Sequence, residues 1–497
     1  MTLVPLDIPA GFYRNGTDLE QAGRWRDGSL VRWRDNSLRP IGGWRERKTS
    51  FCTNPVRGMH TWETLSGNAY LVGGSHDALV IMTGGGTLTD ITPTDLATGR
   101  EDAATNTGYS GGFYGYGFYG QPIQSSQNSV PQEATTWSLD NFGEDLVACH
   151  YDDGRILLWD TSTTPSTASA LTNAPTDNLG LVVTEERFIF ALGADGNPRR
   201  VQWCDREQNT VWTPATTNEA GDIDLQTSGQ IMQGIRTRGQ TLIITDTDAH
   251  TARYLGPPYV YGFERVGTSC GAISRKSASD VDIGVFWMGQ RGFFRFDGNS
   301  VSEIPCDVHD YVFGDFNVAQ QSKVWSIANG QYGEIWWFYC SSGSTEIDRY
   351  VALDYKENHW LIGELSRTSG VQRGVFRYPF MAGHNADSDI YDHEVGFNFD
   401  SATTFAETGP ISLGVGEQIA KVTKLIPDEI TQGDVNVTFK TRFYPNSTET
   451  SHGPYTPSNP TSVRFSGRQL RMRVEGQSAT QWKVGNMRID AIAGGKR

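Results

Sequence analysis

The sequence predicts an all-β protein built from many short strands. Glycine is abundant, with 56 residues in a chain of 497, and Phe, Trp and Tyr together make up 11%. Aromatic side chains favour strands, whereas glycine favours the tight turns that join them. No long stretch shows apolar residues at helical spacing. Because 37% of the residues are apolar, we also expect a large buried core.

A repeated pattern indicates how these strands are arranged. Seven segments between Val56 and Asp400 each contain an apolar run, a turn of Gly, Asn or Asp, and a second apolar run. The clearest segment, GEIWWFYCSSGSTEIDRYVALDYKENHWLIG, places Asp354 and a polar turn before Trp360. Recurrence at roughly 40 residues, with four short strands per unit, is typical of a β-propeller. We predict a propeller body over residues 56–400, with six to eight blades and seven favoured. The alternative, a stack of β-sandwiches, would not need the spacing from Asp354 to Trp360.

Three regions lie outside the repeat. Residues 401–497 contain stretches such as VNVTFKTRFYP that alternate with period two, which predicts a C-terminal β domain or a strand layer closing the propeller. Residues 1–55 precede the repeats, and we expect them to form an N-terminal docking segment. Residues 108–122 alternate Gly with Phe or Tyr and predict a loop inserted between the first two blades. Its aromatic side chains need burial against a neighbouring subunit or a channel: Phe113, Tyr114, Tyr116, Phe118 and Tyr119.

Charge is distributed unevenly along the chain, whose formal net charge is −15. Residues 1–50 hold nine Lys and Arg against six Asp and Glu, and residues 461–497 hold eight against two. The remaining residues hold 25 against 49, a net charge of −24. An acidic body repels nucleic acid over most of its surface, while the basic ends offer cationic patches.

The chain also lacks several common signals. The N-terminus has no cationic region followed by an apolar one, and nowhere do eighteen apolar residues run together, so we expect neither a secretion signal nor a membrane span. The six cysteines are scattered singly, which predicts buried, reduced thiols. The sequence has no recognisable Cys and His signature and no GxxxxGK[ST] loop. We therefore predict a protein that is not an enzyme and needs no cofactor.

One polar cluster, HNADSDIYDHE, could hold a divalent cation through five side chains: His384, Asp387, Asp389, Asp392 and His393. Strand geometry would send alternate residues to opposite faces, so we expect a solvated loop and assign no metal there.

The N-terminal segment contains the motif W-R-D-x-S-L twice, at residues 25–30 and 33–38. Arginines alternate with tryptophans in this segment, a composition suited to phosphate contact and base stacking. The plainer interpretation is two short strands with turns at residues 27–28 and 35–36 and with Trp and Leu packing inward. On either interpretation the arginines are candidates for docking an acidic partner: Arg24, Arg26, Arg32, Arg34 and Arg39.

Three motifs of this sequence resemble those of a known protein family. The doubled W-R-D-x-S-L, the Tyr/Gly-rich loop and the ending GRQLRMRVEGQSATQWKVGNMRID resemble the tail nozzle, or packaged-DNA stabilisation, proteins of short-tailed bacteriophages. The resemblance implies a propeller-based subunit of a homohexameric ring below the portal and adaptor, located in the tail of a virion assembled in the host cytoplasm. It also implies partners: the adaptor protein, tail fibres or tailspikes, and double-stranded DNA that passes through without sequence specificity.

The alternative function is a carbohydrate-binding or sialidase-like propeller that recognises a host surface. A sugar-binding propeller would repeat an aromatic residue and a carboxylate at the same place in each blade, and sialidases repeat the turn Ser-x-Asp-x-Gly-x-x-Trp, which is absent here. Trp287, Trp336 and Trp337 lie at the centres of predicted strands, where we expect them to pack in the core.

Overall fold

The computed structural model describes residues 2–104, 132–162, 167–384, 388–413, 418–428, 430–476 and 480–495. Over these ranges the regular structure is almost entirely β. The helices there are α1 (His309–Gly314) and the short 3-10 helices η1 (Ala194–Gly196) and η2 (Val318–Lys323). The predicted all-β class is confirmed.

Four-stranded antiparallel sheets follow one another along the chain, each formed by consecutive strands. The first three sheets consist of β6 (Gly58–Glu63), β7 (Ala69–Gly74), β8 (Leu79–Thr83) and β9 (Leu88–Asp90); β10 (Trp137–Phe142), β11 (Asp145–His150), β12 (Ile156–Trp159) and β13 (Ser169–Ala170); and β14 (Gly180–Val183), β15 (Ile189–Leu192), β16 (Arg200–Trp203) and β17 (Gly221–Asp224). The next three consist of β18 (Ile231–Thr237), β19 (Gln240–Thr245), β20 (Asp248–Gly256) and β21 (Val260–Thr268); β22 (Ala278–Val281), β23 (Gly284–Met288), β24 (Phe293–Phe296) and β25 (Val301–Ile304); and β26 (Trp325–Asn329), β27 (Glu334–Tyr339), β28 (Arg349–Asp354) and β29 (His359–Glu364).

A seventh sheet closes the ring. It consists of β30 (Arg367–Val371), β31 (Phe380–Gly383), β32 (Ile390–His393) and, from the other end of the chain, β5 (Trp44–Lys48). The first strand of each sheet contacts the first strand of the next, and β30 contacts β6. This closed arrangement confirms the predicted β-propeller.

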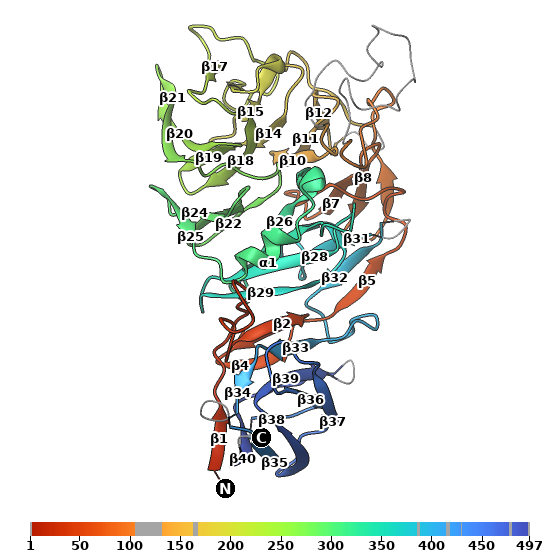
Figure 1. Ribbon diagram of the computed structural model, residues 1–497. Helices are drawn as coiled ribbons and strands as arrows, with labels where there is room; N and C mark the ends of the chain where they lie inside the picture. The colour runs from red at the N-terminus through yellow and green to blue at the C-terminus, as the bar shows by residue number, and fades with distance from the viewer. Residues whose placement is uncertain are drawn as a thin grey trace, which may run out of the picture.

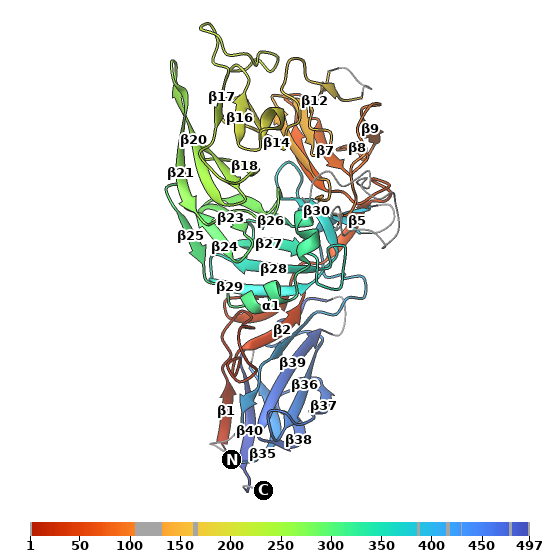
Figure 2. The ribbon, with the colours of Figure 1, turned by 45° about the horizontal axis from the view of Figure 1, so that its top comes forward.

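A smaller β domain lies below the propeller (Figures 1 and 2). One of its sheets contains β1 (Thr2–Leu6), β40 (Met487–Ala493), β35 (Ala420–Pro427) and β38 (Thr461–Gly467). The other contains β2 (Trp25–Ser29), β33 (Phe405–Thr408), β39 (Gln469–Gly476), β36 (Val435–Arg442), β37 (Thr450–Tyr455) and β34 (Ile411–Ser412). We call this part, built on the predicted C-terminal β domain, the distal domain.

The two parts of the molecule share one continuous core. Buried side chains of the distal domain, such as Phe439, belong to the same apolar cluster as Trp337 and Trp360 of the sixth sheet. Phe12 and Trp33 join the two parts, with ring centroids 4.9 Å apart. Trp33 lies in a hairpin of β3 (Val31–Arg34) and β4 (Ser37–Pro40). Residues 1–55 are therefore distributed over both parts of the fold, as β1 and β2 in the distal domain and β5 in the propeller.

Candidate interaction surfaces

Four of the five arginines proposed for docking contact their own chain and stay partly exposed. Arg24 lies 3.6 Å from Asp307, and Arg26 lies 3.0 Å from Asp18. Arg34 donates to the Tyr332 carbonyl oxygen at 3.2 Å, and Arg39 donates to the Arg34 carbonyl oxygen at 3.3 Å. These contacts fasten the N-terminal segment to the rest of the subunit, whereas docking to a partner remains a prediction.

Arg32, also a candidate for docking, is the exception because it is buried. It is only 2% exposed, and its Nε lies 2.8 Å from a Glu334 carboxylate oxygen. A second ion pair joins it to Glu394 at 2.5 Å, and its guanidinium lies over the Tyr332 ring. Arg32 and Trp33, neighbours in β3, are both buried, because Glu334 of the sixth sheet lies against Arg32. Arg32 is an internal residue of the fold.

The predicted Gly/Tyr-rich loop, with Phe113, Tyr114, Tyr116, Phe118 and Tyr119, lies outside the described residues, but its base is described. Ala104 and Gln132 face each other, and the Ala104 N–H donates to the Gln132 carbonyl oxygen at 2.9 Å. The η2 helix holds both sides of this base, because Gln320 accepts from the Ala103 N–H and Ser322 accepts from the Ala134 N–H, each at 3.0 Å. The insertion therefore begins and ends at one fixed place on the propeller.

A buried ionic network surrounds that base. Lys323, with a fully buried side chain, donates to Asp102 at 2.5 Å and to Glu346 at 3.2 Å. Glu346 also receives two hydrogen bonds from Arg57, at 2.8 and 2.5 Å. Burial alone would raise the pKa of Glu346, but Arg57 and Lys323 outweigh it and hold the pKa at about 2.

This network marks one end of the propeller ring. Arg57 immediately precedes β6, Lys323 lies two residues before β26, and the buried Arg275 lies three residues before β22. Because these are the first strands of their sheets, the three residues lie at the same end of the ring. Arg275 is 3.2 Å from Glu133, beside the base of the insertion. Buried charged side chains thus lie at this end of the subunit's own propeller.

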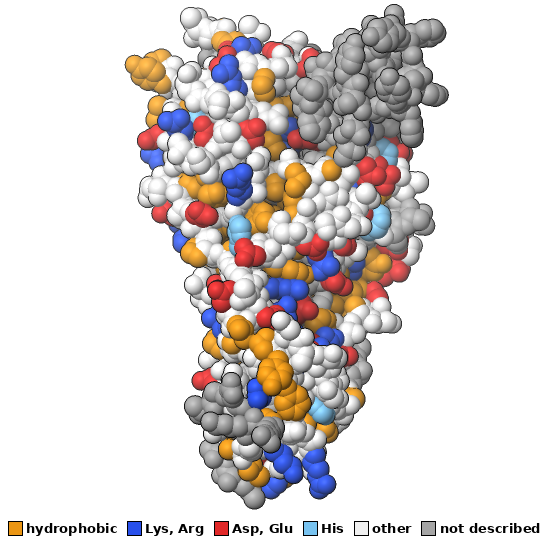
Figure 3. Space-filling view, viewed as in Figure 1, with side chains coloured by type: hydrophobic (Ala, Val, Ile, Leu, Met, Phe, Trp, Pro, Cys, Tyr) orange, Lys and Arg blue, Asp and Glu red, His pale blue; other side chains and the backbone are white. Residues whose placement is uncertain are grey.

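A second surface lies on the outer face of the sheet that contains β35. Four exposed cationic residues define what we call the distal cationic face: Lys421, Lys424, Arg464 and Arg488. Strand register places them on three adjacent strands, β38, β35 and β40. The carboxylate paired in register with Lys424, that of Asp490, is only 4% exposed and accepts from the Thr423 hydroxyl at 3.2 Å. Figure 3 shows Lys and Arg side chains at this lower tip.

The polar cluster at residues 384–393 does not converge on one point. Asp392 pairs with Arg45 at 2.6 Å, and His393 Nε2 accepts from Arg367 at 2.9 Å. Asp387 lies outside the described residues. The described members are therefore engaged separately with neighbouring strands.

The cysteines are free, as predicted, and five of the six are buried: Cys52, Cys149, Cys204, Cys270 and Cys340. Burial raises the pKa of the Cys149 thiol to about 12, so it stays protonated at neutral pH.

Comparison with known proteins gives likeness at the level of the fold. No family model matches the sequence, and no curated protein matches it. Among solved structures, virginiamycin B lyase from Staphylococcus aureus is similar at a TM-score of 0.41 and 8% identity, over 70% of this chain and 98% of the lyase. PorZ, a surface component of the type IX secretion system of Porphyromonas gingivalis, has a TM-score of 0.37 and 9% identity, over 85% of this chain and 46% of PorZ. The dihydro-haem d1 dehydrogenase NirN has a TM-score of 0.36 and 10% identity, over 68% of this chain and 65% of NirN.

These comparisons contradict the prediction that the chain is not an enzyme. The similar structures include a lyase and a dehydrogenase, whereas the prediction depended only on missing catalytic motifs. The absence of catalytic motifs known from other folds does not exclude an active site in a propeller, because propeller sites are assembled from loops of several blades. At this low identity the likeness concerns the fold and assigns no reaction to this chain.

A groove at the fourth and fifth sheets is lined by charged groups of the kind used in acid–base catalysis. Its volume is about 550 Å³, and side chains of both signs line it: Arg238, Arg253, Asp280, Asp282, Arg295 and Asp297. Burial raises the pKa of Asp280 to about 6, although Arg238 opposes the shift. Carboxylates with displaced pKa values beside arginines are typical of acid–base sites.

No described helix is long and apolar enough to cross a membrane.

Proposed function

We propose that this protein is a structural subunit of the tail nozzle of a short-tailed bacteriophage. A ring of its copies would lie below the portal and adaptor, where it would conduct and retain the packaged double-stranded DNA. The observation that carries the proposal is that both ends bearing the family resemblance belong to one module. β2, from the first W-R-D-x-S-L motif, pairs with β33, which pairs with β39 from the C-terminal ending. Leu38, from the second motif, pairs with Val484.

This meeting of the two ends supports the resemblance for a physical reason. Similarity in two short segments at opposite ends of a chain carries little weight if the segments lie apart in space. Here β1 also pairs with β40 along five residues. The resembling segments therefore specify a common folded unit, the distal domain, and not two unrelated strands.

The passage for DNA would lie between subunits. The first strands of neighbouring sheets contact one another around the subunit's own ring, and Arg57, Arg275 and Lys323 are buried at one end of it, so we expect a duplex about 20 Å across to pass outside the single propeller. In a ring of copies the axis is left open, and six copies are expected from the family resemblance.

Charge supports a conduit. Exposed Lys and Arg along the passage would bind phosphates and retard sliding. Residues 51–460, with a net charge of −24, can supply an axis lined by neutral and acidic groups. The distal cationic face then fits a contact with an acidic protein surface, such as a face of the adaptor or of another tail protein.

The carbohydrate-binding alternative gains no support from the aromatic residues considered for it. Trp287, Trp336 and Trp337 are 0%, 3% and 0% exposed. They pack in the core and offer no platform for a sugar ring.

Electron microscopy of purified phage tails, with this protein located by antibody labelling, tests the proposal. We expect a closed ring of copies between the adaptor and the distal tip. Isolated copies, or absence of the protein from virions, would overturn it. Mass measurement of the protein alone and with its neighbouring virion proteins gives the ring size.

A further inference from the structure

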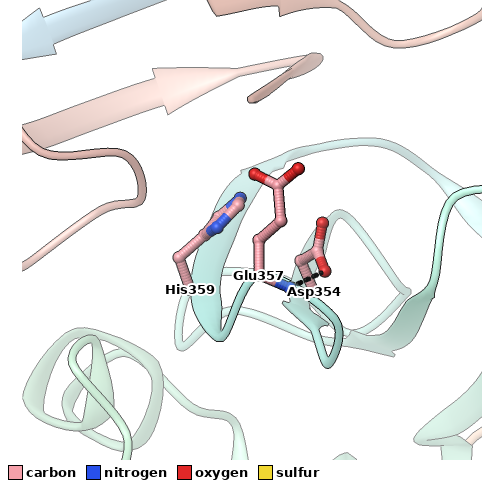
Figure 4. A group of neighbouring side chains, drawn as sticks. All are labelled: Asp354, Glu357 and His359. Atoms are coloured by element: carbon pink, nitrogen blue, oxygen red, sulfur yellow. Dashed lines mark hydrogen bonds between the residues drawn. The ribbon is translucent and has the colours of Figure 1, made fainter. Parts of the chain in front are cut away.

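The turn between β28 and β29 brings three metal-binding side chains together. Asp354 ends β28 and His359 begins β29, and the two residues are paired in register across the hairpin. Glu357 lies in the turn between them. A ring nitrogen of His359 and one oxygen of each carboxylate lie within 4.8 Å of one another. Figure 4 shows the His359 imidazole beside the Glu357 side chain, with Asp354 on the neighbouring strand.

His359 shows an unsatisfied polar atom at this place. The residue is only 5% exposed, and its Nε2 atom has no hydrogen-bond partner among the described residues. A buried polar atom without a partner is destabilising, so it indicates a ligand at the site. Trp33 packs edge-on against the imidazole, with centroids 5.9 Å apart. A Cβ atom at Gly11 would approach the His359 Cβ to 2.5 Å, so glycine there allows the N-terminal segment to lie against the histidine.

Asp354, like His359, is held in place by its surroundings, whereas the Glu357 side chain is free to move. Asp354 is 1% exposed, and one of its oxygens accepts from the backbone N–H groups of Lys356 and Glu357 at 2.9 and 2.8 Å. Glu357 is exposed, and its carboxylate accepts a long 3.3 Å hydrogen bond from the Asp35 N–H. Two buried side chains therefore provide a rigid base, and the third can move toward an ion.

We propose that Asp354, Glu357 and His359 bind a divalent transition-metal ion such as Zn²⁺ or Mn²⁺, with Nε2 as the histidine ligand. One imidazole nitrogen with two carboxylates suits these ions better than Ca²⁺, which prefers oxygen ligands alone. Such an ion holds its ligand atoms at about 2.0–2.2 Å. The exposed Glu357 side chain is free to adjust to that geometry.

The position of the site gives the ion a structural role. The β28–β29 turn belongs to the propeller, whereas Gly11, Trp33 and Asp35 belong to the N-terminal segment that continues into the distal domain. An ion held at this contact would fasten the two parts of the subunit together and raise the stability of the folded chain. The inference is independent of the nozzle proposal.

Isothermal titration of the full chain with ZnCl₂ and with MnCl₂, after removal of metal by EDTA and dialysis, tests the site. We expect one saturable site per chain for at least one of the two ions, and a rise in the thermal unfolding midpoint on binding. Glu357→Gln changes only an exposed side chain and should weaken binding by about tenfold or more. Glu185→Gln, at an exposed turn residue of the third sheet, is the matched control and should bind like the wild type.

Asp354→Asn and His359→Ala should abolish binding, and Glu357→Gln keeps the test valid if either of these variants fails to fold. Binding that survives Glu357→Gln unchanged but is removed by His384→Ala would overturn the proposal, because His384 is an exposed histidine elsewhere. Absence of a saturable site for both ions in the wild type would also overturn it.

Discussion

Arg32 and Glu334 form a buried ion pair, with 2.8 Å between the guanidinium Nε and a carboxylate oxygen, although 302 residues separate them in sequence. Their side chains are 3% and 1% exposed. The pair joins β3 of the N-terminal segment to β27 of the sixth sheet. The N-terminal segment is therefore part of the folded interior and not an appended arm.

Removing this arginine should be strongly destabilising. Arg32→Met leaves the Glu334 and Glu394 carboxylates buried without their shared cation, which costs about 3–5 kcal/mol. Urea unfolding followed by tryptophan fluorescence measures the change. Arg47→Ala, at an exposed position, should change the free energy of unfolding by less than about 0.5 kcal/mol. Equal effects of the two substitutions would contradict the assigned role of Arg32.

Glu346 should make stability depend on pH. Its pKa in the folded chain, about 2, is lower than its usual value of 4.5. The deprotonated form therefore stabilises the fold above pH 4.5, by an amount on the order of 3 kcal/mol, and this contribution is lost as the pH falls toward 2. Glu346→Gln should be less stable than the wild type at pH 7, and the difference should shrink by about half at pH 3. Urea unfolding of both proteins between pH 7 and pH 3 checks this, and a constant difference would rule it out.

Local patterns predicted most of the fold. Period-two alternation identified the strands of the distal domain, and the turn at Asp35 and Asn36, with φ of 51° and 56°, joins β3 to β4 as expected. The expected turn at Asp27 and Gly28 is wrong, because both residues lie inside β2 and the chain turns at Leu30. A bulge in β2, between Trp25 and Asp27, accommodates residues that are usually found in turns.

The features that sequence analysis missed depend on long-range pairing. Nothing near Trp44 indicates that β5 completes the seventh sheet, because its partner β32 lies more than 300 residues away. The burial of Arg32 was missed for the same reason. The metal-binding triad did have a local signal, since Asp354, Glu357 and His359 lie within the spacing from Asp354 to Trp360. We interpreted that spacing only as a blade signature.

Closure of the propeller by β5 should depend on Trp44. The residue is 4% exposed, its Nε1 donates to Asp400 at 2.5 Å, and the Arg367 guanidinium lies 4.9 Å from its ring centroid. Trp44→Ala removes this packing and should cost about 3–5 kcal/mol. Glu46→Ala, at an exposed position of the same strand, should leave the thermal unfolding midpoint nearly unchanged. A midpoint that is equally insensitive to Trp44→Ala would show that β5 does not hold the ring closed.

The Gly/Tyr-rich insertion should be dispensable for folding of the isolated subunit. Ala104 and Gln132 already face each other, so replacing residues 105–131 by Asn-Gly leaves a two-residue hairpin turn. We expect circular dichroism and the unfolding midpoint to match the wild type. If the aromatic residues of the insertion contact a neighbouring subunit or the channel, as the sequence predicts, tail assembly or DNA retention should be impaired. A variant that fails to fold would place the insertion in the core instead.

Reversal of charge on the distal cationic face should affect assembly and not folding. Lys421, Arg464 and Arg488 are exposed, so their replacement by Glu should change the unfolding free energy little. If this face docks an acidic protein surface, like charges would then oppose each other, and incorporation into tails should fall sharply. The same charge change at three exposed arginines outside this face, Arg47, Arg253 and Arg373, controls for net charge. Quantitative immunoblotting of purified virions measures incorporation.

If both triple variants assemble as well as the wild type, the cationic face takes no part in docking. If the two variants are equally impaired, net charge and not this face controls assembly. Selective loss of binding to a short DNA duplex, with normal incorporation, would instead identify the face as a DNA contact, and the passage between subunits would then be lined partly by cations rather than by the acidic body.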